Sequence, residues 1–134
     1  GSFAEHYLGN YLMFFFPDDV DTNAIFGSSG ALSSFSQRIE IAYAFGLLTK
    51  TSRKDLNLIR KIRNYFAHHP SDAGFESSPV SEWVEGLSIP ATIKSHDGTV
   101  QVEHNRKARY ILSISMCIAE LHNAMLAKRA QSGA

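Results

Sequence analysis

The sequence is poor in the features that mark several large classes of protein. Cys117 is the one cysteine among 134 residues, so no internal disulfide forms and a Cys/His metal cluster is not expected. No apolar run approaches the roughly 20 residues that a membrane helix needs. The sequence also has no glycine-rich phosphate-binding motif and no Ser-His-Asp signature. We therefore predict a cytoplasmic protein without a membrane segment, a metal or a cofactor.

Net charge is absent too, because 13 basic and 13 acidic residues cancel, and this argues against a dedicated DNA-binding protein. The basic residues are nevertheless concentrated between residues 50 and 63, where a single acid, Asp55, accompanies them. They are Lys50, Arg53, Lys54, Arg60, Lys61 and Arg63. A solvated helix face and a patch that binds phosphate or a partner both fit this run. Nucleic-acid binding is expected to be weak, salt-sensitive and indifferent to sequence.

Apolar residues recur at three- and four-residue steps along much of the chain, which is typical of amphipathic helices. With 44% hydrophobic residues, the chain suits one domain around one core. The pattern predicts helices over residues 3–16, 32–48, 52–68 and 105–128. We therefore expect an all-α fold, a single-domain helical bundle over residues 1–134 with a long C-terminal helix. Gly1 and Ser2 are typical of the remnant of an expression tag.

Local signals refine these helices. Ser52 and Asp55 have the spacing of a capping box, and Asn105 is a good N-cap for the last helix. Gly46 costs about 1 kcal/mol inside a helix, which fits either a close helix crossing or simple tolerance. Within residues 91–103 an Asp-Gly pair lies between alternating apolar residues, and a small β-hairpin and an irregular loop both fit.

Eight apolar residues from the three longest predicted helices are expected to be buried together. They are Phe35, Ile39, Tyr43, Ile59, Phe66, Ile114, Ile118 and Leu121. On the C-terminal helix, one continuous apolar stripe is predicted, through Tyr110, Ile111, Ile114, Ile118, Leu121 and Met125. Cys117, among apolar neighbours on the same helix, is expected to be a buried thiol.

One group of residues, at the end of the helix predicted over 52–68, carries possible chemistry. Asn64 and His68 are four residues apart and share a helix face, with Arg63 beside them. An arginine can stabilise charge that develops on a phosphodiester, and a histidine can move the proton without a metal. A structural cap at the negative end of the helix dipole explains the same residues. His69, next to a proline, is expected to be an exposed loop residue.

Two longer stretches, residues 30–48 and residues 55–68, resemble the signatures of the mannitol operon repressor (MltR-like) family in order and spacing. The resemblance implies a helical, cytoplasmic, bacterial protein that controls a carbohydrate operon. It also implies the absence of a helix-turn-helix, which agrees with the zero net charge. Repression is then expected to act through a protein partner, another regulator, rather than through direct DNA contact. The residues expected to bind such a partner are Arg53, Lys54, Arg60, Lys61, Arg63 and His68.

The segment from Arg63 to His68 also resembles the Arg-x4–6-His motif of HEPN-type helical domains, several of which are metal-independent RNases that act as dimers. Carried over, Arg63 is the phosphate stabiliser, Asn64 its polar companion and His68 the catalytic partner. Such a site needs two copies facing each other, and Tyr65 is a candidate for the face of the homodimer. We take the regulator as the first interpretation and the RNase or RNA-binding module as the second.

Overall fold

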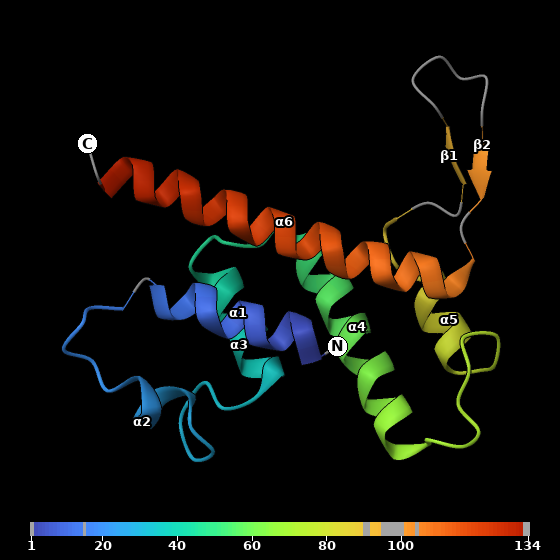
Figure 1. Ribbon diagram of the computed structural model, residues 1–134, viewed down its shortest axis with the longest axis horizontal. Coiled ribbons are helices and arrows are strands. Elements are labelled where there is room, and N and C mark those ends of the chain that lie inside the picture. The colour runs from blue at the N-terminus through green and yellow to red at the C-terminus, as the bar shows by residue number, and fades with distance from the viewer. Residues whose placement is uncertain (1, 15, 90–91, 95–100, 104, 133–134) are drawn as a thin grey trace.

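The computed structural model describes residues 2–14, 16–89, 92–94, 101–103 and 105–132. Its elements are α1 (Ser2–Phe14), α2 (Thr22–Phe26), α3 (Phe35–Ala44), α4 (Lys50–His68), α5 (Val80–Glu85), β1 (Thr92–Lys94), β2 (Gln101–Glu103) and α6 (Arg106–Ser132). The predicted helical bundle with a long C-terminal helix is confirmed. Figure 1 shows α6 running alongside α1 and crossing one end of α4, with its C-terminal end extending beyond α1.

The core forms where α1, α3, α4 and α6 meet. Helix α1 contacts α3 and α6, while α4 contacts α3, α5 and α6. The largest fully buried side chains are Leu8, Leu12, Phe35, Ile39, Leu56, Ile59, Ile62, Val80, Val84 and Leu121. Each contributes about 1.5–3 kcal/mol relative to an exposed position, so this set accounts for the packing of the bundle. Of the eight predicted core residues, Phe35, Ile39, Ile59 and Leu121 are buried, and Tyr43, Phe66, Ile114 and Ile118 are half-buried.

Helix α3 is shorter than the predicted range 32–48. It begins after Ser34, whose side chain and that of Gln37 form a capping box with the backbone. It ends before Gly46, which has φ +76° and donates its backbone N–H to Tyr43 O at 3.0 Å. Nothing lies within 4 Å of the position a Cβ would take at Gly46, so of the two alternatives the close helix crossing is wrong. The glycine is instead a left-handed helix terminator.

Helix α4 begins earlier than predicted. Thr49 is the N-cap and its hydroxyl accepts the backbone N–H of Ser52 at 3.2 Å. The capping box expected at Ser52 and Asp55 is therefore wrong. The Ser52 hydroxyl donates to Glu120 on α6, and Asp55 accepts from Ser88. Both side chains therefore form hydrogen bonds with residues distant in sequence and not with the backbone of the first turn.

Leu121 of the predicted stripe is buried, but along the rest of α6 the buried side is turned by about one residue from that stripe. The residues that face the core are Arg109, Ser113, Cys117 and Leu121, which are 5%, 3%, 3% and 2% exposed. Tyr110, Ile114 and Ile118 lie at the edge of the interface instead. One residue rotates a helix position by about 100°. The core side of α6 therefore carries an arginine and a serine that its apolar pattern did not predict, whereas Cys117 is buried as expected.

By length and apolar composition alone, α6 is long and apolar enough to cross a membrane. The span Arg106–Gln131 contains a window of mean hydropathy 1.3, and 17% of that window is buried in the bundle. The core helix of a bundle can have the same composition, so this is weak evidence for a membrane span. The expectation of a cytoplasmic chain without a membrane segment stays a prediction.

Between α5 and α6, the described parts of residues 91–103 are the two short strands. They pair antiparallel, with Ile93 opposite Val102. The pairing corresponds to the hairpin alternative. The Asp-Gly pair expected to make its turn lies outside the described residues.

Candidate functional site

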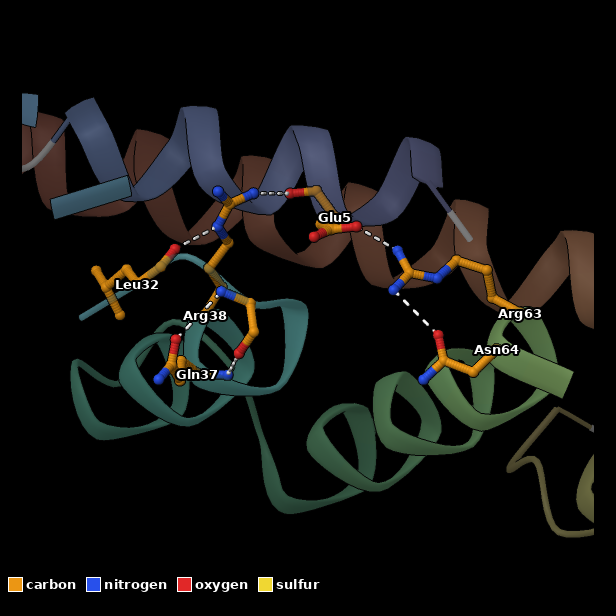
Figure 2. A network of polar contacts seen from close by, with 7 residues as sticks. Glu5, Leu32, Gln37, Arg38, Arg63 and Asn64 are labelled. Atoms are coloured by element: carbon orange, nitrogen blue, oxygen red, sulfur yellow. Dashed lines mark hydrogen bonds and ion pairs between the residues drawn. The ribbon is translucent and has the colours of Figure 1, made fainter. Parts of the chain in front are cut away.

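Arg63, the arginine of the candidate site, is half-buried at the surface of the bundle and paired within the chain. Its Nη1 forms an ion pair with the Glu5 carboxylate of α1, and the two side chains are 25% and 26% exposed. Its Nη2 donates to Asn64 Oδ1 at 3.2 Å, and its Cζ lies 5.1 Å from the centre of the Phe35 ring on α3. Figure 2 shows the guanidinium between Glu5 and Asn64. Arg63 therefore ties α4 to α1 and α3.

Arg38 of α3 lies beside this contact, and sequence reasoning missed it. Its Nε donates to Leu32 O at 2.8 Å, and its Nη1 lies 3.4 Å from the backbone oxygen of Glu5 (Figure 2). Its Nη2 lies 3.4 Å from the backbone oxygen of Phe26. A Cβ at Gly9 would lie 3.1 Å from Arg38 Nη1, so the glycine leaves room for the arginine. The sequence signal that could have found this contact is the position of Arg38 directly before Ile39, a residue of the apolar stripe. Together Arg38 and Arg63 make the α1 end of the bundle a structural junction.

The two histidines at the end of α4 lie in different surroundings: His68 is exposed and His69 is half-buried. His68 is exposed and makes no hydrogen bond or ion pair with another described side chain. His69 is half-buried: its ring stacks on Tyr65 at 3.9 Å, and its Nδ1 lies 3.0 Å from Tyr65 O. The prediction of His69 as an exposed loop residue is therefore wrong. Tyr65 also meets Trp83 edge-on at 5.9 Å, so much of its surface is used within the chain.

The structure does not bring Arg63 and His68 together. Five residues along a helix correspond to about 140° of net rotation, so the two side chains leave α4 in different directions. Asn64 and His68 share a face as predicted, but the Asn64 side chain accepts a bond from Arg63. To reach a phosphate, Arg63 would first have to leave the Glu5 carboxylate. Within one chain, Arg63 therefore holds α4 to α1, and His68 is an exposed residue at the end of α4.

The solvent side of α4 carries a continuous basic and amide surface, which we call the α4 face. It consists of Lys50, Lys54, Asn57, Lys61, Asn64 and His68, spaced three and four residues apart. The three lysines and His68 are exposed, while Asp55, the one acid of this helix, is buried on the opposite side. At 1.5 Å per residue, the 19 residues of α4 span about 28 Å. The N-terminal half of the face borders a hollow of about 340 Å³.

The remaining predicted binding residues are partly neutralised or buried. Arg53 pairs with Glu40 through Nη2–Oε2 at 2.6 Å and Nε–Oε1 at 3.1 Å, and lies over the Tyr43 ring at 4.5 Å. The hydrogen bonds that Arg53 donates to the Glu40 carboxylate are the main cause that raises the pKa of Arg53. Arg60 is half-buried, and its Nε is buried and has no hydrogen-bond partner among the described residues. Lys54, Lys61 and His68 are thus the members of the predicted set that face solvent.

A larger hollow of about 520 Å³ lies on the outer side of α3, next to the Arg53–Glu40 pair. Its walls include Phe16, Ile25 and Ile41, and Glu40 is at its rim. The hollow is mainly apolar and adjoins the α4 face through the Arg53–Glu40 ion pair.

Among the described residues, no group of three or more His, Cys, Asp or Glu side chains is placed to hold a metal ion. Comparison with protein-family models, with curated proteins and with solved structures finds no match to this chain. The resemblance to the mannitol operon repressor family therefore rests on the two sequence stretches alone.

Proposed function

We propose that this chain is a bacterial regulator of the mannitol operon repressor type that binds a protein partner through the α4 face. The observation that carries the proposal is the exposed row of Lys50, Lys54, Lys61 and His68, without an acid among them. Such a row is complementary to an acidic protein surface, and charge complementarity sets the rate and selectivity of docking. The partner is expected to be another regulator with a row of carboxylates.

A protein partner fits this face better than duplex DNA does. The molecule has no net charge, and Arg53 is already paired with a carboxylate of its own chain. Arginine is the side chain that makes bidentate contacts with guanine in the major groove, and both Arg53 and Arg63 are engaged elsewhere. Three lysines without such contacts support phosphate binding that is weak, salt-dependent and indifferent to sequence.

The environment of Arg63 argues against the RNase interpretation. A phosphate stabiliser must be available to the substrate, and Arg63 is held by Glu5, Asn64 and Phe35. The same contacts give the arginine a sufficient structural role. No second observation in the described part of the chain favours RNA cleavage.

The test is transcription of the mannitol operon in the bacterium that encodes the chain, with the gene deleted and variants supplied back. We expect deletion to raise transcription several-fold without mannitol. Lys61→Glu on the α4 face should fail to restore repression. Lys107→Glu should restore it, because this exposed lysine lies on α6 and the change in charge is identical. Unchanged transcription on deletion, or full repression by Lys61→Glu, would overturn the proposal.

A further inference from the structure

A small polar cavity lies at the other end of α4, away from the contacts described above. Its volume is about 160 Å³, and it lies between the first turns of α4, the segment after α5 and the middle of α6. Its polar lining includes Ser52, Asp55, Ser88, Ser113 and Glu120. Ile89 and Met116 add apolar wall. No lysine or arginine of the described residues lines it.

The two carboxylates of the cavity meet neutral donors. Asp55 is 6% exposed and accepts the backbone N–H of Ser88 at 3.0 Å and the Ser88 hydroxyl. Glu120 accepts the backbone N–H of Thr49 at 3.2 Å and the Ser52 hydroxyl. Neither forms an ion pair with a basic side chain of the described residues. The cavity thus holds two carboxylates and no cationic side chain from the described residues.

A second, independent feature is the hydroxyl of Ser113. This side chain lines the cavity, is 3% exposed, and its Oγ has no hydrogen-bond partner among the described residues. Most buried hydroxyls in proteins are paired, because an unpaired one has lost its water without a replacement. A donor inside the cavity would supply what Ser113 lacks.

The side chains that line the cavity suit an organic cation better than a metal ion. Burial, together with the negative charges of Asp55 and Glu120, raises the pKa of Cys117 to about 12. The thiol therefore stays protonated at neutral pH and is a poor metal ligand. In the part of the chain that the structure describes, no histidine lines the cavity, which leaves two carboxylates and hydroxyls as ligands.

We propose that this cavity binds a short primary alkylammonium group, such as the aminoalkyl end of a small amine. An ammonium has three donors, which match Asp55, Glu120 and Ser113. The volume equals that of about five water molecules at roughly 30 Å³ each, which is too large for a bare ion and suits three or four heavy atoms. Ile89 and Met116 provide surface for the alkyl chain. An anion is excluded, because the Glu120 carboxylate already accepts the donors at the start of α4, the backbone N–H of Thr49 and the Ser52 hydroxyl.

The test is an amide NMR titration of the whole chain with n-propylammonium chloride at constant ionic strength. Saturable shifts are expected at Thr49, Ser52 and Ser88, with a dissociation constant of roughly 0.1–10 mM for so small a ligand. The neutral isostere 1-propanol and the bare cation potassium should not produce them. Ser113→Ala and Glu120→Gln should each weaken binding about tenfold. Ser115→Ala is the matched control, because its exposed hydroxyl donates to its own helix at Ile111 O.

Two variants keep the result interpretable if one of them unfolds, and circular dichroism identifies the folded one. Shifts that are absent with propylammonium, or equal with 1-propanol, would overturn the proposal. Equal saturable shifts with potassium would replace it with an inorganic cation site. A loss of affinity in Ser115→Ala as large as that in Ser113→Ala would also contradict it.

Discussion

At the C-terminal end of α4 the half-buried charge is an arginine that meets a carboxylate, whereas at the N-terminal end two carboxylates meet only hydroxyl and amide groups. Arg63 has an ion pair with Glu5, a hydrogen bond with Asn64 and a ring beneath it. Asp55 and Glu120 have neutral donors and an unpaired serine nearby. The same helix thus satisfies its charge at one end and leaves it uncompensated at the other.

This difference suits the arginine end of α4 to a structural role and the carboxylate end to ligand binding. A charge that is removed from water needs a counter-charge or several hydrogen bonds, or it becomes unfavourable. The arginine end has both and can serve as a clamp. The carboxylate end has hydrogen bonds and no counter-charge, so it is the end where a cationic ligand adds stability.

The largest expected effect concerns the thiol beside the carboxylate end. The pKa of Cys117 is raised from 9.0 to about 12, so at pH 8 its thiolate is about 1000-fold rarer than in the unfolded chain. Alkylation by iodoacetamide should be slower by at least that factor in the folded protein than in urea. Asp55→Asn should speed the folded reaction, because one negative charge is removed. Burial of the thiol is the main cause of the raised pKa, and the charges of Asp55 and Glu120 add to it. A folded rate within tenfold of the unfolded rate would contradict the raised pKa, and an unchanged rate in Asp55→Asn would contradict the contribution of that carboxylate.

The next effect is on stability at the same end. Asp55→Ala should lower the free energy of unfolding by about 2–3 kcal/mol, because it leaves the N–H and hydroxyl of Ser88 without their acceptor. Asp72→Ala, at an exposed position, should change it by less than about 0.5 kcal/mol. Urea unfolding measures both. Similar values for the two variants would mean that Asp55 contributes no more than a surface acid.

A smaller effect is expected for the ion pair at the arginine end. A double-mutant cycle with Glu5→Gln and Arg63→Gln should give a coupling of about 1–2 kcal/mol, since the side chains are 25% and 26% exposed. The matched pair Glu40 and Arg53 is 50% and 40% exposed and should give about 0.5 kcal/mol. Equal couplings would remove the claim that Arg63 is a clamp.

Sequence periodicity was sufficient for the long helices and for half of the eight predicted core residues. Phe35, Ile39 and Ile59 are buried as their three- and four-residue spacing predicted. It failed at the ends of α3 and α4, because Ser34 and Thr49 were not recognised as the N-caps. Caps depend on the side chain and on the backbone conformation at one residue, which a repeat of apolar positions does not report.

Periodicity also failed to choose the buried side of α6. That helix is apolar over more than one side, with Ile111, Met116 and Leu126 exposed, so its pattern allows more than one orientation. Arg109 can be buried because Glu85 and the backbone oxygen of Ile89 receive its guanidinium, at 3.1 and 3.2 Å.

The candidate site was found in sequence, but its meaning depended on a residue far away. Arg63, Asn64 and His68 have the spacing of a phosphodiester site, and nothing in that spacing indicates the ion pair with Glu5, 58 residues earlier. The cavity at the other end was missed for the same reason, since α4, Ser88 and α6 contribute to it from three separate segments.

The central claim is that the arginine end of α4 is structural, and RNA integrity tests it most directly. Purified chain is incubated with labelled single-stranded RNA under a metal chelator, beside His68→Ala. Because Arg63 is held by Glu5, we predict that the RNA stays intact with both proteins. Cleavage by the original chain that disappears with His68→Ala would contradict the account and establish the RNase interpretation.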